Sequence, residues 1–349
     1  MRSFAATIQH IARKSGFLTV FPVSDVSLIA ISEHRDKLSP YMKLPLPKRE
    51  SVKKTFDKSL TMEAAAESGI PQPRTFSIHN TSELKDAARK ITYPAVIKPK
   101  WSWVWNRKPA LHARPYYVNS SAELIRSYEA VHREFPFPLI QEYIPGHNVS
   151  VAVLADNSKP KAACCIRVYR TMPVTGGNSV LRESIDPDPV LLDYAYKLLK
   201  ALEWHGVAEV EFRIDSRDKI PKLMEINGRF WASVDVAIES GIDFPYLLYR
   251  LVNGDNINPE FTYRKGVKSR WFIGDVQNLF ATLKGEPRLA RIKKPDKLKT
   301  LLSFLKFYEK DMHYDCFSFD DPLPFFILGR MLNLLLGSKR KLASGAGSV

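Results

Sequence analysis

The sequence predicts a fold of the α+β class, because capped helices alternate with strands in its first half and a series of strands follows. Five runs are rich in β-forming residues: 139–144, 149–155, 161–169, 207–215 and 223–227. We expect the first three to form a meander, and the last two to pair as a hairpin about a turn near Asp218. The strands therefore pair largely with their neighbours in sequence.

Helix starts are marked before and between these strands. Asn80 with Glu83, and Ser120 with Glu123, have the spacing of a capping box, so helices should begin there and run to about residues 91 and 132. A strand over 94–98 lies between them, and a capped helix is predicted over about 188–203.

The first 70 residues predict helices with one strand. Apolar residues at helical spacing predict a helix that stops at Gly16, followed by a strand over 17–23 and a second helix from Ser24 or Asp25. The proline-spaced run 44–47 and the charged residues after it indicate a boundary near residue 50. One further helix is expected to carry Asp57 and Lys58 and to end at Gly69, since prolines follow.

The composition narrows the class of protein. With 349 residues, 45% of them hydrophobic and 26% charged, the chain is neither disordered nor fibrous nor a polytopic membrane protein. The 52 lysines and arginines exceed the 37 acidic residues by 15, which favours anionic partners. Three cysteines, without disulfide or zinc spacing, fit a reducing compartment, so we expect a cytoplasmic location.

The end of the chain is basic and then apolar. Nine lysines and arginines lie between residues 284 and 310, and a solvated helical surface is favoured over a phosphate-binding face. The apolar run 324–337 is too short to span a bilayer. Because Lys339-Arg340-Lys341 follows it, a weak membrane-surface contact is an alternative to a terminal helix docked on the core.

The hairpin is the most informative feature. Its predicted register places Glu211 opposite Glu225, and Glu209 opposite Asn227, with Ala208, Val210, Phe212, Met224 and Ile226 on the other face. Facing carboxylates repel unless a cation lies between them, and carboxylate and amide oxygens suit Mg²⁺. The alternative is an ordinary polar face with Arg213 and Lys222 as counter-ions.

Phosphate binding has weaker signals. Lys98 ends a strand directly before Pro99, where its ammonium would project from the sheet, whereas Lys58 taken alone reads as a surface lysine. The chain has no P-loop, no G-x-G-x-x-G run, no G-x-S-x-G elbow and no H-E-x-x-H spacing. Rossmann, hydrolase and zinc-enzyme interpretations are thereby excluded.

Five segments in this order resemble the signatures of the ATP-grasp superfamily, and the resemblance covers residues 57–253. They are DK-x(10)-G-I-P-x-P at 57–73, Y-P-A-V-I-K-P at 93–99, Q-E-Y-I-P-G at 141–146, V-E-F at 210–212 and M-E-I-N-G-R-F-W at 224–231. Residues 269–272 and 321–324 further resemble carboxylate–amine ligases of that superfamily whose substrate is undetermined.

The resemblance implies a role for particular residues. Lys58 and Lys98 would contact the phosphates of ATP, and Arg229 would act on the transition state. The alternative for Arg229 is a structural ion pair with Asp235 or Glu239. Glu211, Glu225 and Asn227 match the family's ligands for Mg²⁺ (or Mn²⁺). The adenosine would lie against Gln141, Glu142, Tyr143, Ile144 and Asn148. The loop Gly176, Gly177, Asn178 and Ser179 is expected near the substrate, with a plain hairpin turn as the alternative. Nearby, Arg167, Arg170 and Arg182 are candidates to hold an anionic substrate, with solvation of the strand ends as the alternative.

The implied activity is that of an ATP-dependent ligase, which activates a carboxylate as an acyl phosphate and joins it to an amine. A non-catalytic ATP-binding module is the rival, because residues 99–115 contain no glycine where the family has a glycine-rich loop. A basic nucleic-acid-binding protein is disfavoured, since no recognition motif accompanies the charge. The partners expected are small molecules, and the sequence leaves open a homo-oligomer.

The resemblance also implies a domain layout. We expect a partial α/β segment over 1–50, which is half of the usual N-terminal domain, and an ATP-grasp domain over 51–260. Its two α+β lobes, at about 90–185 and 186–260, would clasp the nucleotide. A basic, mostly helical extension would follow over 261–349.

Overall fold

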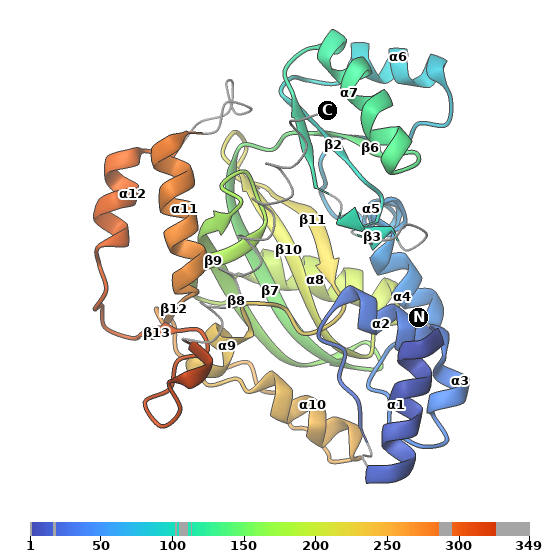
Figure 1. The fold of residues 1–349 in the computed structure, drawn as a ribbon, viewed down its shortest axis with the longest axis vertical. Helices are drawn as coiled ribbons and strands as arrows, with labels where there is room; N and C mark the ends of the chain where they lie inside the picture. The colour runs from blue at the N-terminus through green and yellow to red at the C-terminus, as the bar shows by residue number, and fades with distance from the viewer. Residues whose placement is uncertain are drawn as a thin grey trace, which may run out of the picture.

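The computed structural model describes residues 2–16, 19–101, 103–104, 111–112, 114–285 and 295–325. Within them, two main sheets, each covered by helices, confirm the α+β class (Figure 1). No helix in the described ranges is both long and apolar enough to cross a bilayer. The domain limits at residues 50 and 260 stay a prediction.

The N-terminal part is helical. Its elements are α1 (Arg2–Ser15), α2 (Asp25–Glu33), α3 (Arg35–Leu38), α4 (Arg49–Phe56) and α5 (Lys58–Glu67). The predicted strand over 17–23 is wrong for its described residues, because only one bridge, Thr19 with Lys43, forms there. A single extended segment with no sheet beside it cannot satisfy its backbone groups as a strand.

The single helix that was predicted to carry Asp57 and Lys58 is two helices in the structure, α4 and α5. Asp57 interrupts the expected helix through Lys58, since its extended backbone ends α4 and its side chain caps α5 by accepting from Ser59 N. Lys58 is therefore the first residue of α5. This places its side chain at the end of a helix, beside the large sheet.

The small sheet forms the upper lobe in Figure 1 and has the order β1-β6-β2-β5. Its elements are β1 (Thr75–Phe76), α6 (Thr81–Lys90), β2 (Ala95–Lys98), β5 (Tyr116–Val118), α7 (Ser121–Glu134) and β6 (Leu139–Glu142). Asn80 and Ser120 cap α6 and α7 as predicted. A short pair, β3 (Trp103–Val104) with β4 (Leu111–His112), lies between β2 and β5 in the chain.

The large sheet has the order β11-β10-β7-β8-β9-β12-β13. Its strands are β7 (Gly146–Asp156), β8 (Lys159–Met172), β9 (Asn178–Ser184), β10 (Gly206–Asp215), β11 (Pro221–Asn227), β12 (Lys268–Arg270) and β13 (Met312–Tyr314). The meander prediction is therefore wrong in one part, because the run 139–144 supplies β6 of the small sheet and only β7, β8 and β9 follow one another in the large one. The C-terminal extension, expected to be mostly helical, adds β12 and β13.

Gly146 marks the passage between the two sheets. Its φ is +151°, and a Cβ there would lie 1.8 Å from the backbone oxygen of Ile214. Only glycine allows the chain to leave β6 and enter β7 so close to β10. The two sheets therefore meet at this point.

Helices cover both faces of the large sheet. On one face, Ala208, Val210 and Phe212 pack against α8 (Pro189–Ala201). On the other face, Val207 packs against α9 (Val234–Ser240) and α10 (Phe244–Val252). Because side chains alternate along a strand, Glu209 and Glu211 continue this second face toward the end where Gly146 joins the sheets.

Candidate functional site

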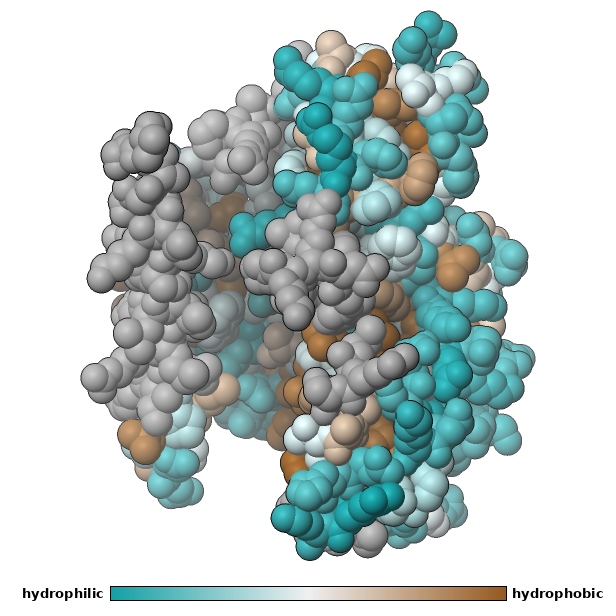
Figure 2. Space-filling model, turned by 45° about the vertical axis from the view of Figure 1, so that its right-hand side comes forward, coloured by the Kyte–Doolittle hydropathy of each residue, from teal (hydrophilic) through white to brown (hydrophobic). Residues whose placement is uncertain are grey.

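A cavity of about 850 Å³ lies where the two sheets meet. Its wall combines residues of the small sheet, of the β10–β11 hairpin, of the β8–β9 connection and of the N-terminal helices. Figure 2 shows one face of the molecule, mostly hydrophilic at its periphery, with hydrophobic side chains gathered toward its recessed middle. All the residues that the sequence predicted for the site line this cavity, except the three arginines considered for an anionic substrate.

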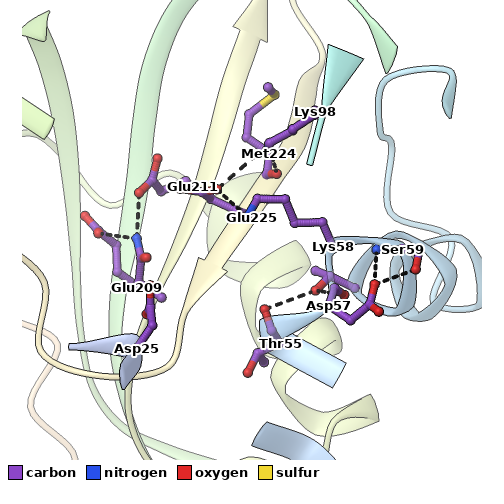
Figure 3. Close-up of polar contacts among 12 residues, drawn as sticks. Asp25, Thr55, Asp57, Lys58, Ser59, Lys98, Glu209, Glu211, Met224 and Glu225 are labelled. Atoms are coloured by element: carbon purple, nitrogen blue, oxygen red, sulfur yellow. Dashed lines mark hydrogen bonds and ion pairs between the residues drawn. The ribbon is translucent and has the colours of Figure 1, made fainter. Parts of the chain in front are cut away.

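The carboxylates face each other as the sequence predicted. Glu211 pairs with Glu225, and Glu209 with Asn227, in the register of β10 and β11. The Asn227 amide lies between two of these groups, since its Nδ2 donates to Glu211 Oε1 at 2.6 Å and to Glu209 Oε2 at 3.1 Å. Figure 3 shows Glu209, Glu211 and Glu225 gathered on this hairpin.

The hairpin contains a bulge that the sequence did not reveal. The register shifts between Glu211 and Phe212, so that Phe212 pairs with Leu223 and Met224 has no partner across the strand. The prediction that Met224 shares the apolar face is therefore wrong: Leu223 is buried there, and Met224 lines the cavity instead.

The two facing glutamates have different surroundings. Burial, together with Glu225 and Glu209, raises the pKa of Glu211 well above its ordinary value. Burial also opposes ionisation of Glu225, but Lys98, Lys58 and Arg229 outweigh it and hold its pKa below the ordinary value. The site thus favours a proton or another cation at Glu211.

Two lysines from distant segments meet at Glu225. Lys58 Nζ, from α5, and Lys98 Nζ, from the end of β2, each lie 3.9 Å from Glu225 Oε2 (Figure 3). Lys98 Nζ also donates to the backbone oxygen of Met224 at 3.1 Å. Burial lowers the pKa of Lys98, Glu225 raises it and Lys58 lowers it further. Two ammonium groups this close favour an anion between the sheets.

The donor set fits a hard divalent ion. Glu211, Glu225 and Asn227 offer two carboxylates and one amide oxygen, and the repulsion that raises the pKa of Glu211 is what a cation would relieve. In the described part of the chain, no group of three or more His, Cys, Asp or Glu side chains is arranged to hold a metal. A metal here would therefore need the amide, or oxygens from a bound phosphate, to complete its shell.

Arg229 points into the same cavity. Its Nε donates to Asp25 Oδ1 at 3.0 Å and one terminal nitrogen donates to Asn227 Oδ1 at 3.1 Å. Asp25 is the first residue of α2, 204 positions away in the chain. The structural alternative, a pairing of Arg229 with Asp235 or Glu239, is not formed, and the N-terminal helices instead supply its carboxylate.

The predicted nucleotide-binding stretch lines the cavity, but two of its side chains are engaged elsewhere. Gln141 is buried and donates to Thr75 Oγ1 at 3.0 Å, and Glu142 accepts from Arg217 at 2.7 Å. The Tyr143 ring makes an edge contact with Tyr117. Ile144 and Asn148 complete the stretch within the cavity wall. Tyr143 and Asn148 are thus the half-buried members of the stretch that could face a ligand, whereas Ile144 is buried.

The predicted substrate loop also lines the cavity. Gly176 and Gly177 lie in the connection from β8 to β9, and Asn178 and Ser179 begin β9. Tyr117 of the small sheet donates to the backbone oxygen of Thr175 in this connection. A Cβ on Gly177 would lie 2.7 Å from the backbone oxygen of Met172, so the turn requires glycine. The loop therefore bridges the large and small sheets.

The three arginines considered for an anionic substrate are used differently. Arg170 forms two bonds of 2.6 Å with Asp275, and Arg182 is fully buried and pairs with Asp315. Arg167 stacks over the Tyr169 ring. Arg170 and Arg182 instead tie β8 and β9 to the C-terminal extension, because their charges are neutralised there.

Three residues of the site were not predicted from the sequence to be functional. Glu209 is buried and accepts hydrogen bonds from Ser150 Oγ at 3.0 Å and from the Asn227 amide. Asp25 accepts a hydrogen bond from Arg229. The Arg213 guanidinium lies over the Tyr143 ring. The predicted register of the hairpin, which placed Glu209 opposite Asn227, was the sequence feature that could have identified Glu209 as a site residue. Residues 105–110, including Trp105 of the glycine-free segment, and the apolar run after residue 325 lie outside the described residues.

Several known proteins are similar to this chain. A family model described as "ATP-grasp in the biosynthetic pathway with Ter operon" matches residues 134–272. The D-aspartate ligase of Enterococcus faecium is 22% identical over 301 residues, covering 80% of this chain and 70% of that protein. The carbamoyl phosphate synthase large chain of Pyrococcus furiosus is 23% identical over 202 residues, covering 55% of this chain. The chain matches only 18% of the length of that synthase.

A solved structure shows the same fold. The biotin carboxylase domain of the 2-oxoglutarate carboxylase from Hydrogenobacter thermophilus, crystallised with MgADP, ADP and bicarbonate, is similar with a TM-score of 0.61. The sequence identity is 17%, and the match covers 76% of this chain and 60% of that one.

Proposed function

We propose that this chain, which has the ATP-grasp fold, is a member of the ATP-grasp superfamily and a ligase that joins a carboxylate to an amine. The observation that carries the proposal is the convergence of Lys58, Lys98, Glu225 and Arg229 on one cavity from three separate segments of the chain. A cytoplasmic location and small-molecule substrates belong to the same proposal.

The proposed reaction has two steps. A carboxylate oxygen of the first substrate attacks the γ-phosphorus of ATP, the bond to ADP breaks, and an acyl phosphate forms. The amine nitrogen then attacks the acyl carbon, inorganic phosphate leaves, and the amine gives up one proton. Neither step needs a nucleophile from the protein, so the chain has to position groups and balance charge.

The described side chains suit these tasks. Lys58 and Lys98 bring positive charge between the sheets, where the phosphates of ATP would lie. Glu211, Glu225 and Asn227 would hold Mg²⁺ or Mn²⁺, which neutralises phosphate charge. Arg229, fixed by Asp25, presents a planar guanidinium that binds phosphoryl oxygens in pairs. Tyr143, Ile144 and Asn148 offer the wall for the adenosine.

The experiment is a screen of ADP and phosphate release with the full chain, Mg²⁺ and a library of carboxylates paired with amines. We expect at least one pair to release ADP above the rate without substrates, and Glu225→Gln to abolish that release because neutral glutamine binds Mg²⁺ poorly. Asp186→Asn, in an exposed ion pair with Lys265, is the matched control and should keep the activity.

A second outcome would favour the rival function. If a non-hydrolysable ATP analogue binds with Mg²⁺ but no pair is turned over, the chain is a nucleotide-binding module without ligase activity. Retention of nucleic acid with a steep salt dependence, in the absence of nucleotide binding, would instead favour the third alternative.

A further inference from the structure

Two helices of the C-terminal extension form the outer layer beside β8. They are α11 (Phe272–Lys284) and α12 (Lys297–Phe304), which lie side by side at the left edge of Figure 1. Their inner sides pack inward: Phe272 and Phe304 stack with ring centroids 6.2 Å apart, and Phe304 is buried. The core contacts of α12 are thus made by one side of the helix.

The opposite side of α12 is also apolar. Leu298, Leu302 and Leu305 follow one another at intervals of four and three residues, which places them in one row along the helix. They are 65%, 56% and 54% exposed. Phe280 and Leu283, near the end of α11, are exposed as well. We call these five residues the outer apolar face.

Positive charge flanks this face. Lys284 ends α11, and Lys297 and Lys299 stand on either side of Leu298. Lys306, which follows Leu305, pairs with Glu309, and Asp296 caps the start of α12. The described part of α12 contains no acidic residue, and the one acidic residue of α11, Asp275, is buried in ion pairs. Leucines in a row with lysines beside them have the pattern of a helix that lies in a membrane interface.

We propose that the outer apolar face docks on the surface of an anionic lipid bilayer. The leucines would enter the boundary between headgroups and acyl chains, while the lysines extend their ammonium groups to the lipid phosphates. A second copy of the chain fits the same face less well. In a two-fold interface the lysines of one copy would face those of the other, and like charges repel.

The first test is sedimentation of the full chain with vesicles in low salt. We expect retention on vesicles of phosphatidylcholine mixed with phosphatidylglycerol, and at least ten-fold less on phosphatidylcholine alone. The double variant Leu298→Glu with Leu302→Glu should lower retention at least ten-fold. The matched control is Tyr246→Glu with Tyr249→Glu on α10, where the two side chains are 56% and 52% exposed, and it should sediment as the wild type does.

A second measurement locates the contact. Cys164 and Cys165 are fully buried, so a Leu302→Cys variant in a Cys316→Ser background takes an environment-sensitive fluorophore at one place. Its emission should shift to the blue with anionic vesicles. No binding by the wild type overturns the proposal. So does retention that survives the double variant while the label stays in water, because another part of the chain then makes the contact. A wild-type dimer that the double variant dissociates assigns the face to a second copy instead. None of these readouts depends on ligase activity.

Discussion

At the scale of single residues, the carboxylates of Glu211 and Glu225 face each other, but their charges are not neutralised equally. Both lysines lie at Glu225, whereas among the described residues the hydrogen-bond donor to Glu211 is the Asn227 amide. From the strand register alone, Glu225→Gln would be expected to stabilise the metal-free protein by relieving repulsion. In the structure, Glu211 is instead the residue whose neutralisation should stabilise the metal-free protein.

We therefore predict that Glu211→Gln raises the melting temperature of the metal-free protein by about 2–4 °C, the effect of roughly 1 kcal/mol. Glu225→Gln should not raise it, because it leaves Lys58 and Lys98 facing each other without a counter-ion. Thermal melts in EDTA measure both variants. A lower melting temperature for Glu211→Gln would show that its carboxylate is structural rather than poised for a cation.

Arg229 gives the second prediction at this scale, and it concerns the proposed ligase reaction. Arg229→Lys keeps the charge but loses the planar pair of donors, so kcat should fall ten-fold or more while the KM for ATP changes little. Steady-state kinetics with an active substrate pair, beside a thermal melt, provide the measurement. An unchanged kcat with a lower melting temperature would mean that the guanidinium serves only to tie α2 to the hairpin through Asp25.

At the scale of elements, local signals decided what the sequence could predict. The caps of α6 and α7 follow from side-chain spacing, as does the register of β10 with β11 over Glu209–Glu211, and these features formed as expected. The bulge at Phe212 did not follow, since an alternating pattern looks the same with or without one extra residue. The strand over 17–23 failed for the opposite reason: its pattern was adequate, but in the described part of the chain only the single bridge of Thr19 with Lys43 forms there.

The third prediction concerns the attachment of α11 to the large sheet. Asp275 is buried and accepts from both Arg170 and Arg270, which is itself fully buried. Asp275→Asn leaves two buried guanidinium groups without a carboxylate, so it should lower the free energy of unfolding by about 3–5 kcal/mol. Urea unfolding measures this, with Asp186→Asn in its exposed pair as the control. Equal midpoints for the two variants would contradict the role assigned to Asp275.

At the scale of the whole molecule, the site is a meeting of segments far apart in the chain. Asp25 reaches Arg229 across 204 positions, and Lys98 reaches Met224 across 126. Local patterns in a single sequence do not predict such contacts, which explains why Asp25 was not predicted as a site residue. Lys58 and Lys98 entered the prediction through the order of family signatures, and their meeting at Glu225 is a product of the fold.

The last prediction concerns how nucleotide binding between the two sheets changes the melting temperature. A ligand that binds the folded chain alone stabilises it, by about 2.7 kcal/mol at a hundred times its Kd, so a non-hydrolysable ATP analogue with Mg²⁺ should raise the melting temperature. Lys98→Met should lose most of this shift, because it removes one of the two ammonium groups between the sheets. It should not destabilise the ligand-free protein greatly, since the Lys98 side chain is only 15% exposed and burial already lowers its pKa. Lys90→Met, at the exposed end of α6, is the matched control and should keep the full shift. If Lys98→Met responds to the nucleotide as the wild type does, the phosphates are not held between the two sheets.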